Sequence, residues 1–190
     1  MDDEPGRRIC DPDPAGRRVY VIDADFSVAE IDVDSLAVTY HRPDTRSLAK
    51  FALGKVRTAR WLGAGVLAVS GSDLAGTYPG TPAGLRLVDT RRWTWKIVDP
   101  TAESFQAGTG VLVAEPAPTA APRRRVTAYG LDGSRGYALD LQRNRGVTVA
   151  GGYAYVCHGR GLLRVLDAAS GARLRAFTRE PLPDCPRFLS

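Results

Sequence analysis

Short apolar runs separated by glycine-containing turns recur along the chain at nearly constant intervals. Four of these runs align without gaps and begin at Val19, Val66, Val111 and Tyr153, so their starts lie 47, 45 and 42 residues apart. Each run is followed by a polar turn or insert and then by another apolar run. Short apolar segments bounded by turn residues are typical of β-strands, and no stretch has the sustained period and caps of a long helix. The pattern predicts four repeats built from strands.

Each repeat contains four candidate strands in about 43 residues, which is typical of a β-propeller blade. The aligned run is the second strand of its repeat, and four of its residues are expected to be buried between sheets: Val21, Val69, Val113 and Val156. The other expected strands are residues 58–62, 104–107 and 146–150 in first position, 28–33, 84–89, 125–130 and 162–167 in third, and 37–41, 93–98, 136–141 and 172–177 in fourth. The predicted fold class is all-β: a β-propeller with four blade-like repeats of four-stranded antiparallel sheet.

The repeats are expected at approximately residues 17–57, 58–100, 101–142 and 143–180, between an N-terminal tail (1–16) and a C-terminal tail (181–190). Repeat one lacks an apolar first strand, because the segment before Val19 contains Pro12 and Pro14, and proline cannot donate a hydrogen bond to a strand pair. The missing strand is expected from residues 186–190 or from sequence upstream of Met1. The second source would make the four blades part of a larger ring, in which case the isolated chain should self-associate through its open blade edges.

Aspartate recurs where the third strand ends. Asp32, Asp89 and Asp167 occupy this position in three repeats, and repeat three has Gly130 there with Asp132 two residues later. Aspartate side chains accept hydrogen bonds from nearby backbone N–H groups in turns. These residues are therefore predicted to cap the turn between the third and fourth strands.

Two connections between the second and third strands are longer than a hairpin needs, residues 74–83 and 116–124. Both are rich in proline or glycine and join the same pair of strands in adjacent repeats, so they should emerge on the same face. Loops positioned by a rigid scaffold often carry binding residues. The alternative is that these inserts are simply tolerated, because lengthening a loop costs little free energy.

Composition and charge exclude some classes of partner. The net charge is +5, carried by 23 arginines and 3 lysines spread along the chain, and the compact basic run at 123–125 has no interleaved aromatic residues. No nucleic-acid partner is therefore expected. The sequence has no run of 18 apolar residues, so no transmembrane segment is expected either. The acidic N-terminus does not resemble a signal peptide; the protein is expected to be cytoplasmic, or extracytoplasmic if a signal sequence lies upstream.

The three cysteines, Cys10, Cys157 and Cys185, include no CxxC pair, so structural zinc is not expected. Cys157 lies inside an apolar strand and is expected to be a small buried hydrophobic residue. Cys10 and Cys185 lie in proline-rich tails. They could form a disulfide, which would imply an oxidising compartment, or they could be two separate surface thiols.

Residues 151–171 read Gly-Gly-Tyr-Ala-Tyr-Val-Cys-His-Gly-Arg-Gly-Leu-Leu-Arg-Val-Leu-Asp-Ala-Ala-Ser-Gly. This segment resembles the repeat of the YVTN and PQQ-like β-propellers, in which a Tyr-x-Val strand is followed by a glycine turn, a strand ending in Asp and a Ser/Thr-Gly turn. Repeat one is similar, and the resemblance covers about residues 17–180. It implies a bacterial propeller, often exported and usually with more than four blades. Arg175 replaces the tryptophan that docks adjacent blades in quinoprotein enzymes, and the Gly-His and Trp-Asp pairs of Trp-Asp repeat propellers are absent.

The candidate binding residues are Asp23, Asp25, Arg60, His158 and Arg160. Asp23 and Asp25 could bind a cation, but a calcium loop needs a longer series of ligands, and an aspartate-rich turn is the simpler interpretation. Arg60 lies on an expected first strand, close to the propeller channel. His158 follows Cys157 on a strand, where adjacent side chains point to opposite faces, so the two cannot act as nucleophile and base. No catalytic residue, metal ligand or cofactor is therefore predicted.

These features predict a non-enzymatic binding or scaffold module that recognises a protein or small ligand through loops on one face. The alternative is a propeller enzyme, lactonase-like or a quinoprotein-like oxidoreductase, with part of its site outside this chain. Propeller enzymes gather acidic, His or Arg residues around the central channel. The expected first strands supply little of this beyond Arg60, which favours binding.

Overall fold

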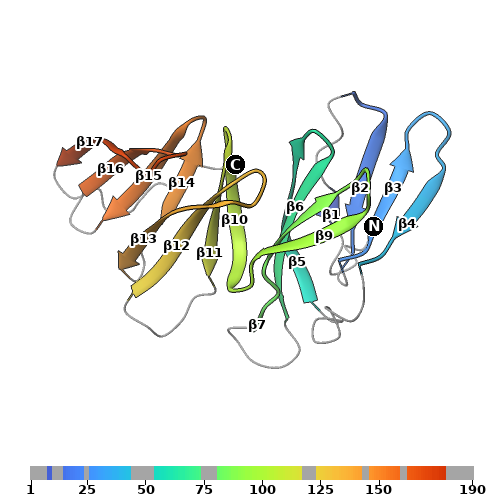
Figure 1. Cartoon of the computed structure of the whole chain (residues 1–190), viewed down its shortest axis with the longest axis horizontal. Helices are drawn as coiled ribbons and strands as arrows, with labels where there is room; N and C mark the ends of the chain where they lie inside the picture. The colour runs from blue at the N-terminus through green and yellow to red at the C-terminus, as the bar shows by residue number, and fades with distance from the viewer. Residues whose placement is uncertain are drawn as a thin grey trace, which may run out of the picture. The chain divides into compact units, whose positions relative to one another are not determined.

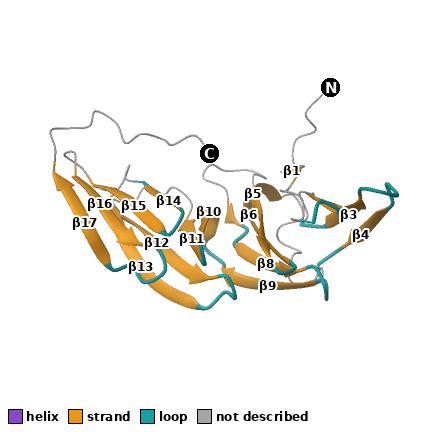
Figure 2. Ribbon diagram, turned by 90° about the horizontal axis from the view of Figure 1, so that it is seen from above, coloured by secondary structure: helices purple, strands orange, loops and turns teal. Residues whose placement is uncertain are grey.

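The computed structural model describes residues 8–9, 15–23, 26–43, 54–73, 81–116, 123–142, 146–158 and 162–178. Within these ranges every regular element is a β-strand (Figure 1), and Figure 2 shows strands joined by turns without any helix. None of the described segments is a helix that could cross a membrane. The strands are β1 (Arg8–Ile9), β2 (Arg18–Ile22), β3 (Val28–Asp32), β4 (Val38–His41), β5 (Gly54–Gly63), β6 (Val66–Asp73), β7 (Thr81–Pro82), β8 (Leu85–Asp89), β9 (Thr94–Asp99), β10 (Ala102–Gly108), β11 (Val111–Pro116), β12 (Arg123–Gly130), β13 (Arg135–Gln142), β14 (Val147–Ala150), β15 (Tyr153–His158), β16 (Leu162–Asp167) and β17 (Arg173–Thr178).

The strands form four antiparallel sheets in chain order (Figure 1). Sheet 1 contains β1 to β4, sheet 2 contains β5, β6, β8 and β9, sheet 3 contains β10 to β13, and sheet 4 contains β14 to β17. The short strand β7 is added to sheet 2, where it pairs with β6. Consecutive four-stranded antiparallel sheets are what the repeat pattern predicted for propeller blades.

The chain divides into two compact units, Met1–Phe105 and Gln106–Ser190, and β10 crosses the boundary between them. In the first unit, sheets 1 and 2 share a core whose buried residues are Tyr20, Ile22, Phe26, Val28, Leu67, Val69, Ala83 and Val88. Antiparallel partners share a face of the sheet, so the pairs Ile22↔Val28 and Leu67↔Val88 place their side chains together on the inner faces.

The second unit has its own core, formed by Val111, Val113, Val126, Ala128, Leu141, Val147, Ala154, Val156, Leu166 and Ala168. Fully burying one Val or Leu side chain contributes about 1.5–3 kcal/mol. An isolated hairpin is only marginally stable in water, so these buried side chains, and not the hairpins alone, stabilise the unit.

The burial predicted for the second strands is confirmed at three of the four valines, which are 1–2% exposed: Val69, Val113 and Val156. Val21 is only half-buried, so the prediction is wrong there. The register of sheet 1 gives the reason. Tyr20 and Ile22 point into the core, and the residue between them must therefore point to the opposite face.

Repeat one has a first strand of its own, contrary to our expectation. Strand β1 pairs antiparallel with β2, with Arg8 opposite Ile22 and Ile9 opposite Val21. The two-residue strand lies inside the expected N-terminal tail, upstream of Pro12 and Pro14, so these prolines do not interrupt it. The first sheet therefore needs no strand from another source.

The predicted aspartate turns are confirmed. The Oδ1 atom of Asp167 accepts hydrogen bonds from the backbone N–H and the hydroxyl of Ser170, at 2.8 and 2.6 Å. Asp32 with Ser35, and Asp132 with Ser134, repeat this pattern, and Asp89 accepts from the N–H groups of residues 91 and 92. Hydrogen bonds within each turn thus hold the connection between the third and fourth strands of its sheet.

Cys157 is half-buried and disulfide-bonded, so its interpretation as a small buried hydrophobic residue is wrong. Its neighbour Val156 points into the core, so the sulfur of Cys157 lies on the opposite, half-exposed face of β15. Cys10 and Cys185, for which the sequence left a disulfide or two separate thiols open, lie outside the described residues.

Candidate binding site

The structure describes three of the five predicted candidate residues, Asp23, Arg60 and His158. Asp23 directly follows β2, where its backbone N–H donates to the carbonyl of Ser27 at 2.9 Å and its backbone carbonyl accepts from the N–H of Phe26, so its backbone forms part of a turn. Arg60 is exposed in the middle of β5. His158 is the last residue of β15 in the other compact unit. Asp25 and Arg160 lie outside the described residues, as do most of the two long inserts, 74–80 and 117–122.

A pocket of about 540 Å³ lies in the first unit, at the end of sheet 2 opposite the insert that follows β6. Val66 pairs with Asp89, so the β5–β6 and β8–β9 turns meet at this end, whereas Asp73 and the insert occupy the other. The volume falls within the range of small-molecule sites. The pocket is lined by Arg18, Tyr20, Trp61, Ala64, Gly65, Thr90, Arg91 and Trp93.

Aromatic rings form the wall of this pocket. Tyr20 and Trp61 are stacked, with ring centroids 5.2 Å apart and planes 11° apart, and Trp93 is tilted against Tyr20 at 6.4 Å. The indole N–H of Trp61 is buried and has no hydrogen-bond partner within the described part of the chain. A buried donor of this kind costs about 1–3 kcal/mol.

The β8–β9 turn holds Arg91 at the mouth of the pocket. The N–H and hydroxyl of Thr90 both donate to the carbonyl of Gly65, at 2.8 and 3.0 Å, and Asp89 accepts from the N–H of Arg91 at 2.9 Å. The Arg91 side chain packs across Gly65, since a Cβ atom at Gly65 would lie 2.8 Å from its Nε. Among the described residues no side chain or carbonyl pairs with the Arg91 guanidinium, so it is available to a ligand.

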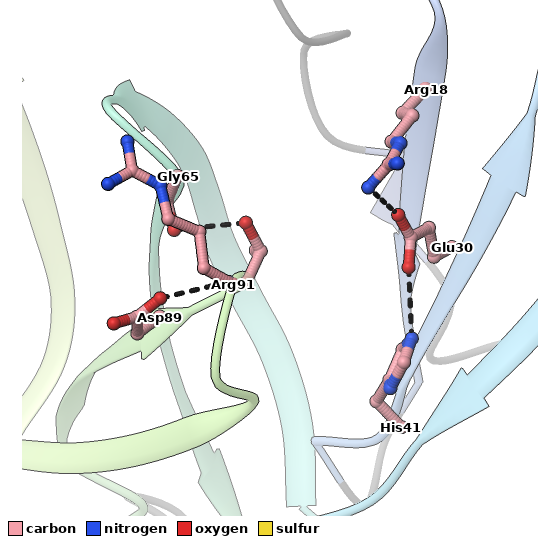
Figure 3. Close-up of polar contacts among 7 residues, drawn as sticks. Arg18, Glu30, His41, Gly65, Asp89 and Arg91 are labelled. Atoms are coloured by element: carbon pink, nitrogen blue, oxygen red, sulfur yellow. Dashed lines mark hydrogen bonds and ion pairs between the residues drawn. The ribbon is translucent and has the colours of Figure 1, made fainter.

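Arg18, by contrast, is neutralised by its neighbours. Figure 3 shows Arg18, Glu30 and His41 in a row across sheet 1, where Glu30 forms an ion pair with Arg18 and lies 3.0 Å from the Nε2 atom of His41. The charge of Glu30 raises the pKa of Arg18, against a smaller lowering by burial. The ring of His41 is stacked on that of Trp93, with centroids 3.3 Å apart. The row therefore fixes Trp93 and leaves Arg91 as the unpaired positive charge of the pocket lining.

Sequence reasoning missed this site because its residues are far apart in the chain. Tyr20, Trp61 and Trp93 come from three separate hairpins, and only the packing of sheet 1 on sheet 2 brings them together. One signal was present: all three tryptophans of the chain lie between residues 61 and 95. Within the described residues there is no group of three or more His, Cys, Asp or Glu side chains that could hold a metal ion.

The fold and the repeated sheets define a β-propeller. No protein-family profile and no curated protein matches the sequence. Among solved structures, the chain is similar to Kuenenia stuttgartiensis hydrazine synthase, with 16% identity and a TM-score of 0.56, over 92% of this chain and 53% of that one. It is also similar to BamB from Moraxella catarrhalis, with 13% identity and a TM-score of 0.50, over 90% of this chain and 50% of that one. The chain thus spans about half the length of these propeller structures, and the likeness establishes the fold alone.

Proposed function

We propose that the chain is a non-enzymatic β-propeller module that binds a protein or small ligand through the pocket at the β5–β6 and β8–β9 turns. The observation that carries the proposal is an unpaired guanidinium, that of Arg91, beside a wall of stacked aromatic rings. Guanidinium groups bind carboxylate and phosphate, and aromatic faces bind flat apolar groups. The ligand is therefore an anion that carries a planar apolar group, either free or as part of a protein.

We also propose that the four sheets belong to a larger ring of the YVTN or PQQ-like type. The likeness of residues 151–171 to that repeat supports this, and so does the span of about half of the propellers that the chain resembles. The rest of the ring would come from further sequence or from another chain.

The binding proposal is tested with indole-3-acetate and its neutral analogue indole-3-acetamide, titrated against the full chain by isothermal titration calorimetry. A hydrogen bond to a charged group contributes about 1.5–3 kcal/mol, so the acid should bind at least about tenfold more tightly than the amide. Arg91→Gln should remove this preference. Arg92→Gln is the matched control, because Arg92 is exposed in the same turn but does not line the pocket. Equal affinity of acid and amide, or an unchanged preference in Arg91→Gln, would refute the proposal.

The alternative is a propeller enzyme, lactonase-like or quinoprotein-like. The pocket lining favours binding, because it contains no carboxylate and no cysteine nucleophile. Thermal shift with divalent metals and with pyrroloquinoline quinone distinguishes the two. A shift of several degrees with either compound would favour the enzyme.

A further inference from the structure

Sheet 1 packs on sheet 2 through one of its faces, and its opposite face is left open. Tyr20 and Ile22 of β2 point into the core that the two sheets share. The residues that alternate with them along β2 point the other way, and strand pairing continues this opposite face onto β3 and β4. The face consists of Val19, Val21, Ala29, Ile31, Val38 and Tyr40. All six side chains are apolar or aromatic, and the described part of the first unit leaves Tyr40 72% exposed.

Sheet 4 has an open face of the same kind. Ala154 and Val156 of β15 point into the core that sheets 3 and 4 share. Tyr153 and Tyr155 alternate with them along the strand and therefore point the other way. Tyr155 pairs with Val165 of β16, which continues this face. Tyr153 is 48% exposed, and the two tyrosine rings lie edge to face with centroids 6.4 Å apart. The face of sheet 4 turned away from sheet 3 therefore presents aromatic and aliphatic groups.

The two open faces are the two halves of one kind of joint between sheets. Within each compact unit, a sheet packs on the sheet that follows it in the chain: sheet 1 on sheet 2, and sheet 3 on sheet 4. The open face of sheet 1 is therefore the one that would meet a preceding sheet, and the open face of sheet 4 is the one that would meet a following sheet. Sheet 4 of one copy can thus pack on sheet 1 of another copy in the order that the chain already uses.

We propose that the partner at both faces is a second copy of this chain, joined head to tail so that sheet 4 of each copy packs on sheet 1 of the other. This pairing rests on the larger ring proposed for the four sheets. Two copies of four sheets each supply eight, within the four to eight blades typical of propellers. The chain matches 53% and 50% of the two propeller structures that it resembles, so a second copy would supply a span of the length that is missing. Head-to-tail joints close into a ring when the rotation between copies allows it, and a closed pair leaves neither apolar face open.

Sedimentation of the full 190-residue chain over a range of concentrations tests the pair. We expect reversible association that reaches twice the 20.5 kDa mass of one chain and stops there. The hydrophobic dye bound per chain should fall as the concentration rises, because the pair covers faces that the single chain exposes. A chain that stays monomeric and binds the dye would overturn the second copy but leave the larger ring standing, since its faces would still be open. A monomer that does not bind the dye would overturn both, and growth beyond two copies would overturn the closed pair.

Mixing two variants tests which faces meet. Tyr40→Arg places a charge on the open face of sheet 1, and Tyr153→Glu places one on the open face of sheet 4. Each variant alone should remain monomeric at concentrations at which the wild type pairs, because both joints of its own pair would contain the charge. An equimolar mixture of the two should recover a dimer, because one of its two joints contains only unchanged residues.

Ile97→Arg is the control for the mixing experiment. Ile97 is exposed on sheet 2, outside both faces, so this variant should pair like the wild type. If sheet 1 met sheet 1 of the other copy instead, Tyr153→Glu alone would pair like the wild type. That result, or a mixture that stays monomeric, would overturn the head-to-tail pair.

Discussion

Single side chains in this protein acquire their roles from the face of the strand on which they fall. Tyr20 and Val21 are neighbours in β2, yet Tyr20 is 2% exposed and lines the pocket, while Val21 lies on the other face. The sequence predicted burial of the second strands correctly where the core face was unambiguous. It misplaced Val21 because all residues from 19 to 22 are apolar or aromatic, so no alternation marked the inner face.

Gly65 shows how one backbone position supports the pocket. Its φ of +81° lies in the left-handed region, and a Cβ atom there would meet Arg91. We expect Gly65→Ala to lose about 1–2 kcal/mol of stability from backbone strain and to weaken indole-3-acetate binding by displacing Arg91. Gly110→Ala is the control, since Gly110 also has a positive φ, of +74°, but would meet no atom within 4 Å. The measurements are thermal melting and calorimetric titration; equal effects of both variants on binding would contradict this role.

At the scale of the element, the turns between third and fourth strands are the most predictable part of the molecule. In these turns an aspartate accepts hydrogen bonds from a serine two or three residues later. All the partners lie within one short segment, so the sequence alone was sufficient to predict the turn. Strand β1 could not be predicted, because a two-residue strand has no pattern of its own and exists only through its pairing with β2. The disulfide of Cys157 was likewise not predicted, because a single cysteine within an apolar run gives no sign of pairing.

These turns make the stability of the folded chain depend on pH. Hydrogen bonds from Ser35 and Ser170 lower the pKa of Asp32 and Asp167 below their ordinary value of 3.8. The unfolded chain therefore binds protons at higher pH than the folded chain does. The stabilisation is present above about pH 4 and is lost as the pH falls through the lowered folded pKa.

We expect the double variant Ser35→Ala/Ser170→Ala to show a shallower fall in melting temperature than the wild type between about pH 4 and pH 2. Ser104→Ala, which changes a serine of β10 outside these turns, should follow the wild-type curve. Melting followed by circular dichroism at a series of pH values provides the comparison. Parallel curves for all three proteins would show that the turns do not carry the acid dependence.

At the scale of the whole molecule, sheet 1 presents an apolar face that no described residue covers. Two rows of residues that pair across β2, β3 and β4 form this face. One row contains Val19, Ile31 and Val38, and the other contains Val21, Ala29 and Tyr40. Val38 is 47% exposed and Tyr40 is 72% exposed. A propeller blade buries both faces against neighbours, so in the larger ring that we propose a further blade would pack on this face.

We therefore expect the isolated chain to self-associate and to bind a hydrophobic dye. Tyr40→Arg should shift sedimentation towards the monomer, because it places a charge in the middle of the contact. Ile97→Arg is the control: Ile97 is similarly exposed, at 46%, but belongs to sheet 2. A compact wild-type monomer that does not bind the dye would instead show that the face needs no partner.

The order of the strands also bears on how the protein is made. Every sheet pairs strands that follow one another in the chain, with only the two-residue β7 interposed between β6 and β8. Contacts between near neighbours form quickly, and domains generally fold from the N-terminal end during synthesis. Each sheet can thus assemble as soon as its own stretch of about 40 residues has left the ribosome, without waiting for the next.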